Sequence, residues 1–115
     1  MQQYRWNEVV KEQMNPQFAR QGIHSERITI ARLELKTGGV VPRHNHENEQ
    51  ISMVLSGRLR FIFDDGESIV GPGEVIQIAP NAFHSVEVLE GGEVIDLFAP
   101  VRSDWLRGDD AYLRR

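Results

Sequence analysis

The sequence has no cysteine among its 115 residues, which excludes disulfide bonds, thiolate metal sites and cysteine nucleophiles. It also lacks any run near the roughly 18 apolar residues that a membrane-spanning helix needs, and its first residues lack the apolar core of a signal peptide. We therefore expect a cytoplasmic protein with no membrane partner. Basic residues are in the minority, 13 against 17 acidic ones, and the net charge of −4 argues against a nucleic-acid partner.

What remains is the composition of an ordinary folded domain, with 40% hydrophobic and 26% charged residues. The length suits one domain with a real apolar core and leaves no room for a second. We therefore expect residues 1–115 to form a single domain.

Short β-type segments separated by turn residues fill most of the chain. The strongest signal spans residues 50–63, where apolar residues on both sides of Ser56 and Gly57 predict a hairpin with a short glycine turn. Residues 4–15 fit either a strand or a turn of helix, Pro16 and Gly22 interrupt the segment after them, and further strands are expected over residues 26–36, 67–70, 74–79, 84–89 and 93–99. Many short strands with turns about every 8–12 residues indicate an all-β sandwich or barrel.

Any imidazole chemistry must come from four histidines, His24, His44, His46 and His84. His44 and His46 are two residues apart, so an extended chain points both to one face, where they can share a metal ion. Gln50 has the same parity, and His84 opens a later strand after a turn containing proline. A His-x-His pair alone is also typical of exposed loops without metal, and His24 has no partner.

These residues stand at spacings that resemble the two motifs of the cupin superfamily. The first motif has a glycine, the His-x-His pair, an acid and a second glycine, and it matches residues 38–57 with Gln50 in place of the acid. The second, glycine followed by Pro-x-Gly and histidine, matches residues 73–84. There, Ala79 replaces the proline and Asn81 the glycine, and asparagine tolerates the left-handed conformation that glycine would adopt.

The resemblance implies a single cupin jelly-roll β-barrel, a double-stranded β-helix, over residues 1–115. The two motifs would form part of the barrel, and residues 103–115 would form a short C-terminal helical tail. The pattern of the tail itself favours a helix with Ser103 as its N-cap.

Gln50 narrows the resemblance to the small pectin-degradation cupins called KdgF, which residues 46–57 and 94–106 also look like. The resemblance implies that one divalent transition metal, Zn, Ni, Fe, Mn or Co, binds to His44, His46, Gln50 and His84. It further implies an activity, the opening of 4,5-unsaturated uronate monosaccharides from pectin or alginate to linear keto-deoxyuronates. Three imidazoles and an amide would leave the ion its full charge of +2, which suits a small anionic sugar.

In the same family, an aspartate in the last strand and an arginine after it match Asp96 and Arg102, the expected catalytic residues. Asp96 would move a proton between the anomeric hydroxyl and the enol carbon; the alternative is a structural aspartate bonded to backbone, Arg58 or Arg60. Arg102 would hold a substrate carboxylate in a bidentate pair, or else balance Asp104 at the surface. Parity places Arg60 and Gln77 in the cavity as substrate-binding residues, with Phe98 shaping its apolar wall.

Two other functions fit the same residues. One is a metal-dependent cupin oxygenase with iron at the same ligands, and the other is a non-catalytic cupin that binds a sugar or another small molecule. We also expect a homodimer formed through a sheet. Its contact residues would be Met53 and Leu55, or Leu59, Phe61 and Phe63.

Overall fold

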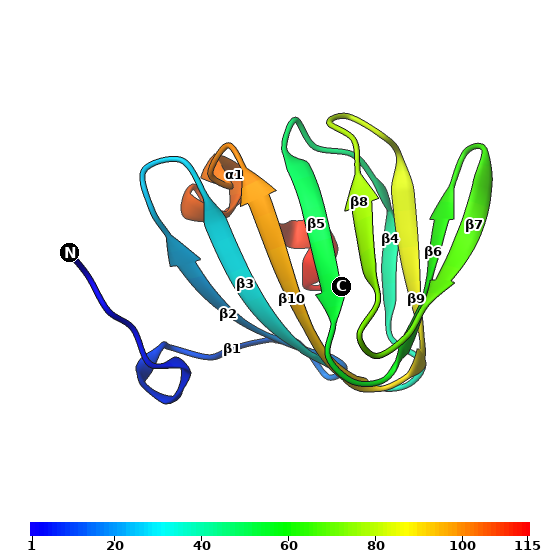
Figure 1. Cartoon of the computed structure of the whole chain (residues 1–115), viewed down its shortest axis with the longest axis horizontal. Coiled ribbons are helices and arrows are strands. Elements are labelled where there is room, and N and C mark those ends of the chain that lie inside the picture. Colours follow the sequence, from blue (N-terminus) through cyan, green and yellow to red (C-terminus); the bar gives the residue numbers. More distant parts are fainter.

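The computed structural model describes residues 1–115 as two β-sheets that face each other (Figure 1). The larger sheet has the strand order β1-β2-β3-β10-β5-β8, and the smaller has the order β4-β9-β6-β7. Every strand pair is antiparallel. The two-sheet, single-domain fold confirms the all-β expectation. None of its helices has the length and apolarity needed to cross a bilayer.

The strands are short, as the turn residues predict. Their bounds are β1 Glu12–Asn15, β2 Phe18–His24, β3 Thr29–Leu35, β4 Val40–His44, β5 Glu49–Val54, β6 Arg58–Phe63, β7 Gly66–Val70, β8 Val75–Ile78, β9 His84–Glu90 and β10 Gly92–Ala99. The helices are η1 Trp6–Glu8, α1 Ser103–Leu106 and η2 Ala111–Leu113.

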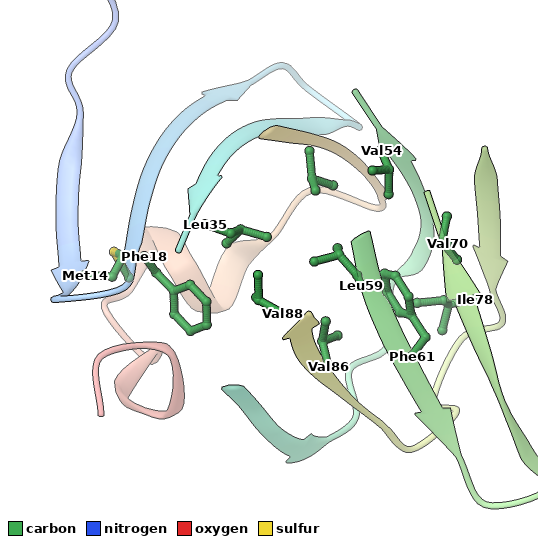
Figure 2. Packing of buried hydrophobic residues seen from close by; sticks show 11 residues of the cluster. Met14, Phe18, Leu35, Val54, Leu59, Phe61, Val70, Ile78, Val86 and Val88 are labelled. Atoms are coloured by element: carbon green, nitrogen blue, oxygen red, sulfur yellow. The ribbon is translucent and has the colours of Figure 1, made fainter. Parts of the chain in front are cut away.

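The core lies between the sheets and is filled by alternate residues of the strands. Along β10, for example, Val94, Asp96 and Phe98 are buried while the residues between them are partly exposed. Figure 2 shows the apolar side chains of both sheets pointing toward one another. The cluster contains Met14, Phe18, Leu35, Val54, Leu59, Phe61, Val70, Ile78, Val86, Val88 and Val94.

The hairpin expected over residues 50–63 is wrong. β5 pairs with β10 and β8 in the larger sheet, whereas β6 pairs with β7 and β9 in the smaller one. The chain crosses between the sheets at Gly57, whose φ is +84° and where a Cβ would lie 2.4 Å from the Glu90 carbonyl oxygen, so only glycine fits. The alternation of apolar residues correctly indicated two half-buried strands. It shows which side chains are buried, but it does not show which strand each of them pairs with.

The same crossing changes the expected dimer contacts. Leu59 and Phe61 were candidates for an outward face, yet they are 3% and 2% exposed and pack in the core. Met53 of β5 and Leu55, which follows this strand, alternate with the buried residues Ser52 and Val54. Of the two proposed contact groups, only Met53 and Leu55 remain available to a partner.

Two further local expectations need correction. β2 runs through Gly22 without interruption, because its register with β3 continues on both sides of that residue. In the tail, α1 is only four residues long, and its N-cap is Arg102 rather than Ser103, with no side-chain cap. The rest of the tail reaches the smaller sheet, where its final turn, η2, contacts β4.

Candidate metal centre

Three histidines converge at one end of the space between the sheets. His44 ends β4 and His84 begins the neighbouring strand β9, where the two residues are directly opposite in register. His46 follows in the loop before β5. One nitrogen atom from each of the three rings lies within 4.8 Å of the others. The structure therefore brings together the three histidines that the sequence singled out, and it leaves His24 apart from them.

The two sequence motifs are tied together by the Asn81 backbone. Asn81 has a φ of 65°, so it adopts the left-handed conformation expected at this position. Its N–H donates to the His46 carbonyl oxygen at 2.8 Å. This hydrogen bond holds the turn before β9 against the loop that carries His46. It thereby fixes the position of His84 relative to His46.

Each imidazole is oriented by a backbone carbonyl on its far side. The Nδ1 atoms of His44, His46 and His84 donate to the carbonyl oxygens of Pro42, Asn48 and Ala82 at 2.8, 3.1 and 2.8 Å. Because a carbonyl oxygen only accepts, Nδ1 must carry the proton, and Nε2 is left with a free lone pair. This is the arrangement by which proteins prepare histidines for metal binding.

Burial keeps these imidazoles neutral. Desolvation is the main reason that the pKa values of His44 and His46 fall to about 4, and it also lowers the pKa of His84. The neighbouring Arg102 charge acts in the same direction on all three. At neutral pH the three rings are therefore unprotonated, the state that a metal ligand requires.

Gln50 lies beside this cluster, where its amide oxygen could serve as a fourth ligand. Its Nε2 donates to the Ser52 hydroxyl at 2.9 Å, and its Oε1 lies 3.0 Å from Nε2 of His46. Because the His46 proton is on Nδ1, neither Oε1 of Gln50 nor Nε2 of His46 carries a proton, so the two atoms cannot form a hydrogen bond with each other. Two ligands each about 2.1 Å from one cation lie about 3 Å apart at a right angle. The residues therefore fit a divalent ion, which would be bound by three imidazoles and one amide.

The site opens into a mostly apolar cavity between the sheets. The residues that line it include His44, Gln50, Ser52, His84, Asp96, Phe98, Arg102, Trp105 and Tyr112. Phe98 therefore lies in the cavity wall, as expected.

Asp96 is the acid of this cavity. It lies opposite Ser52 across β5 and β10, is 7% exposed, and its Oδ1 has no hydrogen-bond partner. Burial raises its pKa to about 6, although the Ser52 hydroxyl and the Arg102 charge lower it in part. No bond to Arg58 or Arg60 satisfies it. A buried carboxyl group that titrates near neutrality beside a ligand set is a strong candidate for proton transfer.

Arg102 lines the cavity, but its bidentate edge is already occupied. Nε and Nη2 donate to the two carboxylate oxygens of Asp104 at 2.9 and 2.7 Å, and Nη2 also donates to the Tyr112 hydroxyl at 2.7 Å. The guanidinium stacks on Phe98 and Trp105. The pairing with Asp104 is the alternative that the sequence suggested, but it is buried, since Arg102 is 2% exposed. A substrate carboxylate therefore cannot take that edge.

Arg60 and Gln77 do not reach the cavity. Arg60 points away from the core side of β6 and pairs with Glu87 at 2.9 Å, and Gln77 is exposed on β8. Both lie on the strand faces opposite the buried residues Leu59 and Ile78. The expectation that they contact substrate assumed the wrong strand face.

Three residues of the site were not indicated by the sequence pattern. Trp105 and Tyr112 reach the cavity from the tail. Asn48, which is 2% exposed, donates from its side chain to the Pro100 and Val101 carbonyl oxygens. It thereby joins the histidine loop to the segment just before Arg102. No local sequence pattern predicts these contacts, because they join positions far apart in the chain, such as Asn48 and Pro100.

The chain is similar to known proteins in sequence and in fold. The family model of the cupin domain matches residues 31–98. A pectin degradation protein KdgF from Dickeya dadantii is 29% identical over 84 residues, which cover 71% of this chain and 76% of that protein.

Among solved structures, KdgF from a Halomonas species superposes with a TM-score of 0.83 at 24% identity, over 90% of this chain and 99% of that one. An RmlC-like cupin from Shewanella frigidimarina gives a TM-score of 0.84 at 21% identity, over 91% and 96% of the two chains. These two likenesses concern the fold.

Proposed function

Because the chain belongs to the cupin family, with a KdgF-like sequence and a three-histidine cluster, we propose that it is a metal-dependent enzyme that opens 4,5-unsaturated uronate monosaccharides to linear keto-deoxyuronates. One observation carries the proposal: Asp96, a buried carboxyl group with an unpartnered oxygen, shares its cavity with three of the four proposed ligand residues, His44, Gln50 and His84. The relative named as a pectin degradation protein supports this class of substrate.

The charge of the site suits an anionic sugar even though the protein has a net charge of −4. Arg102 is balanced by Asp104, so the uncompensated positive charge would come from the ion, which neutral ligands leave at +2. The chemistry that a divalent ion supplies at such a site is Lewis-acid stabilisation of negative charge on a ligand oxygen.

Ring opening is an isomerisation that needs a proton to move within the substrate. The anomeric hydroxyl loses its proton, the bond from C1 to the ring oxygen breaks, and C4 gains a proton, with no net change in atoms or electrons. With a pKa of about 6, Asp96 is suited to accept the first proton and to donate to the carbon. The rings of Phe98 and Trp105 provide an apolar wall against which the sugar packs.

The proposal is tested with protein loaded separately with Zn, Ni, Fe, Mn or Co. Each form is incubated with 4,5-unsaturated galacturonate, and the loss of the conjugated absorbance is followed against metal-free protein and Asp96→Ala. We expect acceleration that requires both metal and Asp96. Wild type that equals buffer and Asp96→Ala would refute the proposal; tight binding without turnover would favour a binding protein, and oxygen uptake with iron an oxygenase.

We also propose a homodimer through the outer face of the larger sheet. Ile51, Met53, Ile95 and Leu97 are neighbours there, because Ile95 pairs with Met53 and Leu97 with Ile51. None of the four belongs to the buried set. Light scattering on wild type and Met53→Glu tests this: a dimeric mass that Met53→Glu reduces supports it, and a monomeric wild type at high concentration refutes it.

A further inference from the structure

Tyr112 lies at the metal centre, yet the proposed proton transfer gives it no role. It belongs to η2, and its ring faces the His44 imidazole with 4.7 Å between ring centroids and 31° between ring planes. Its hydroxyl oxygen accepts a hydrogen bond from Nη2 of Arg102 at 2.7 Å. The side chain is therefore held at two points, by a ligand imidazole and by the buried guanidinium.

The hydroxyl hydrogen of Tyr112 has no acceptor in the protein. A tyrosine hydroxyl can donate one hydrogen bond while it accepts another, and arginine has no lone pair to receive it. Nη1 of Arg102 is also without a protein partner, since Asp104 takes Nε and Nη2. Tyr112 and Arg102 both line the cavity, and no hydrogen bond to a protein acceptor uses the Tyr112 hydroxyl hydrogen or Nη1 of Arg102.

We propose that Tyr112 is a substrate-binding residue that, together with Nη1 of Arg102, recognises a carboxylate on the ligand. Two adjacent donors without an acceptor suit a group that only accepts, and a carboxylate forms stronger hydrogen bonds than a sugar hydroxyl. The identification of the ligand as a uronate rests on the proposed function. The recognition itself needs only a carboxylate beside the metal centre.

This assignment makes the C-terminal segment part of the binding site. η2 is held in place from the opposite side, because the Asn15 side chain donates to the Leu113 carbonyl oxygen at 3.1 Å. Tyr112 is therefore positioned by contacts to β1, β4 and Arg102 together. Selectivity for acidic ligands would depend on the tail as well as on the barrel.

The test uses Tyr112→Phe, which keeps the ring against His44 and removes only the hydroxyl, with Tyr4→Phe as the matched control at an exposed tyrosine. Calorimetry on the cobalt-loaded proteins measures the binding of saturated galacturonate and of its uncharged methyl ester. We expect Tyr112→Phe to weaken galacturonate binding at least about tenfold. Binding of the ester and of cobalt should stay within about twofold, and Tyr4→Phe should match wild type.

The two ligands separate recognition from a general loosening of the site. Equal galacturonate affinity in wild type and Tyr112→Phe, an equal loss for acid and ester, or no galacturonate binding to wild type would each overturn the inference. Turnover of the unsaturated uronate is measured separately on the same proteins. Acid-selective binding without turnover would refute the proposed reaction and still support carboxylate recognition by Tyr112.

Discussion

The two ends of the space between the sheets are built from the same strands but differ in chemistry. At the closed end, Val54 of β5 lies opposite Val94 of β10. At the open end, two residues further along both strands, Ser52 lies opposite Asp96. All four side chains are buried. The alternation along each strand decides which side chains point into the interior. The residue type at each pair of positions then decides whether that pair stabilises the fold or takes part in the proposed reaction.

The difference has an energetic consequence. The closed end gains free energy from buried apolar surface, whereas the open end contains Asp96 Oδ1 and Trp105 Nε1, two buried polar atoms without partners. Buried polar atoms without hydrogen bonds destabilise a fold. Substitutions at the open end should therefore lower activity more than stability, and substitutions at the closed end should lower stability more than activity.

The largest effect is expected from removing a metal ligand at the open end. His84→Ala should lower metal affinity more than about 100-fold and reduce turnover to the background rate, because only two imidazoles and Gln50 remain. Metal content by mass spectrometry and uronate turnover measure this. His24→Ala is the control, since His24 lies outside the cluster; a similar loss in both variants would contradict the assignment.

Asp96→Asn should separate activity from stability. Turnover should fall about 10²–10⁴-fold through loss of the general acid–base group. In metal-free wild type the native state holds the Asp96 proton more tightly than the unfolded chain does, so its stabilising contribution is present below about pH 4 and is lost as pH rises through about 6. The variant should therefore gain up to about 3 kcal/mol relative to wild type as pH rises from 4 to 7.

Urea unfolding of metal-free wild type and Asp96→Asn at pH 4 and pH 7 measures this difference. Asp65→Asn, at an exposed turn position, controls for the loss of one negative charge. A stability difference that does not grow with pH would show that Asp96 is not a strained buried acid.

At the closed end, Leu59→Ala should have the reverse balance. Leu59 is 3% exposed in the apolar cluster, so its truncation should lower the free energy of unfolding by about 2–5 kcal/mol. Turnover well below the melting temperature should remain within about threefold of wild type. Urea unfolding and kinetics on the same samples test this, and a loss of turnover as large as that of Asp96→Asn would remove the distinction between the two ends.

The smallest effects are expected on the outer strand faces. Arg60→Ala removes a partly exposed ion pair with Glu87, worth at most about 1 kcal/mol, and Gln77→Ala removes an exposed amide. Both variants should keep kcat/KM within about twofold of wild type. A tenfold loss in either would mean that the cavity extends to the outer face.

The convergence of the candidate ligands was predictable because its information is local. The i, i+2 spacing of His44 and His46, the parity of Gln50 and the turn before His84 are each read within a few residues. Strand alternation likewise indicated Asp96 and Phe98 as interior residues. The same reasoning failed for Arg60 and Gln77, since parity names two faces and only the packing of the sheets selects the inner one.

By itself, the sequence determined an all-β domain, the positions of most strands and four candidate metal ligands with one acid beside them, because these follow from residue types and short-range spacing. Only the tertiary structure decided that β5 and β6 belong to different sheets, that Asp104 occupies the edge of Arg102 expected to bind substrate, and that Tyr112 lies against His44. Those outcomes depend on how the two sheets close and where the tail crosses them. Such long-range packing has no counterpart in local spacing.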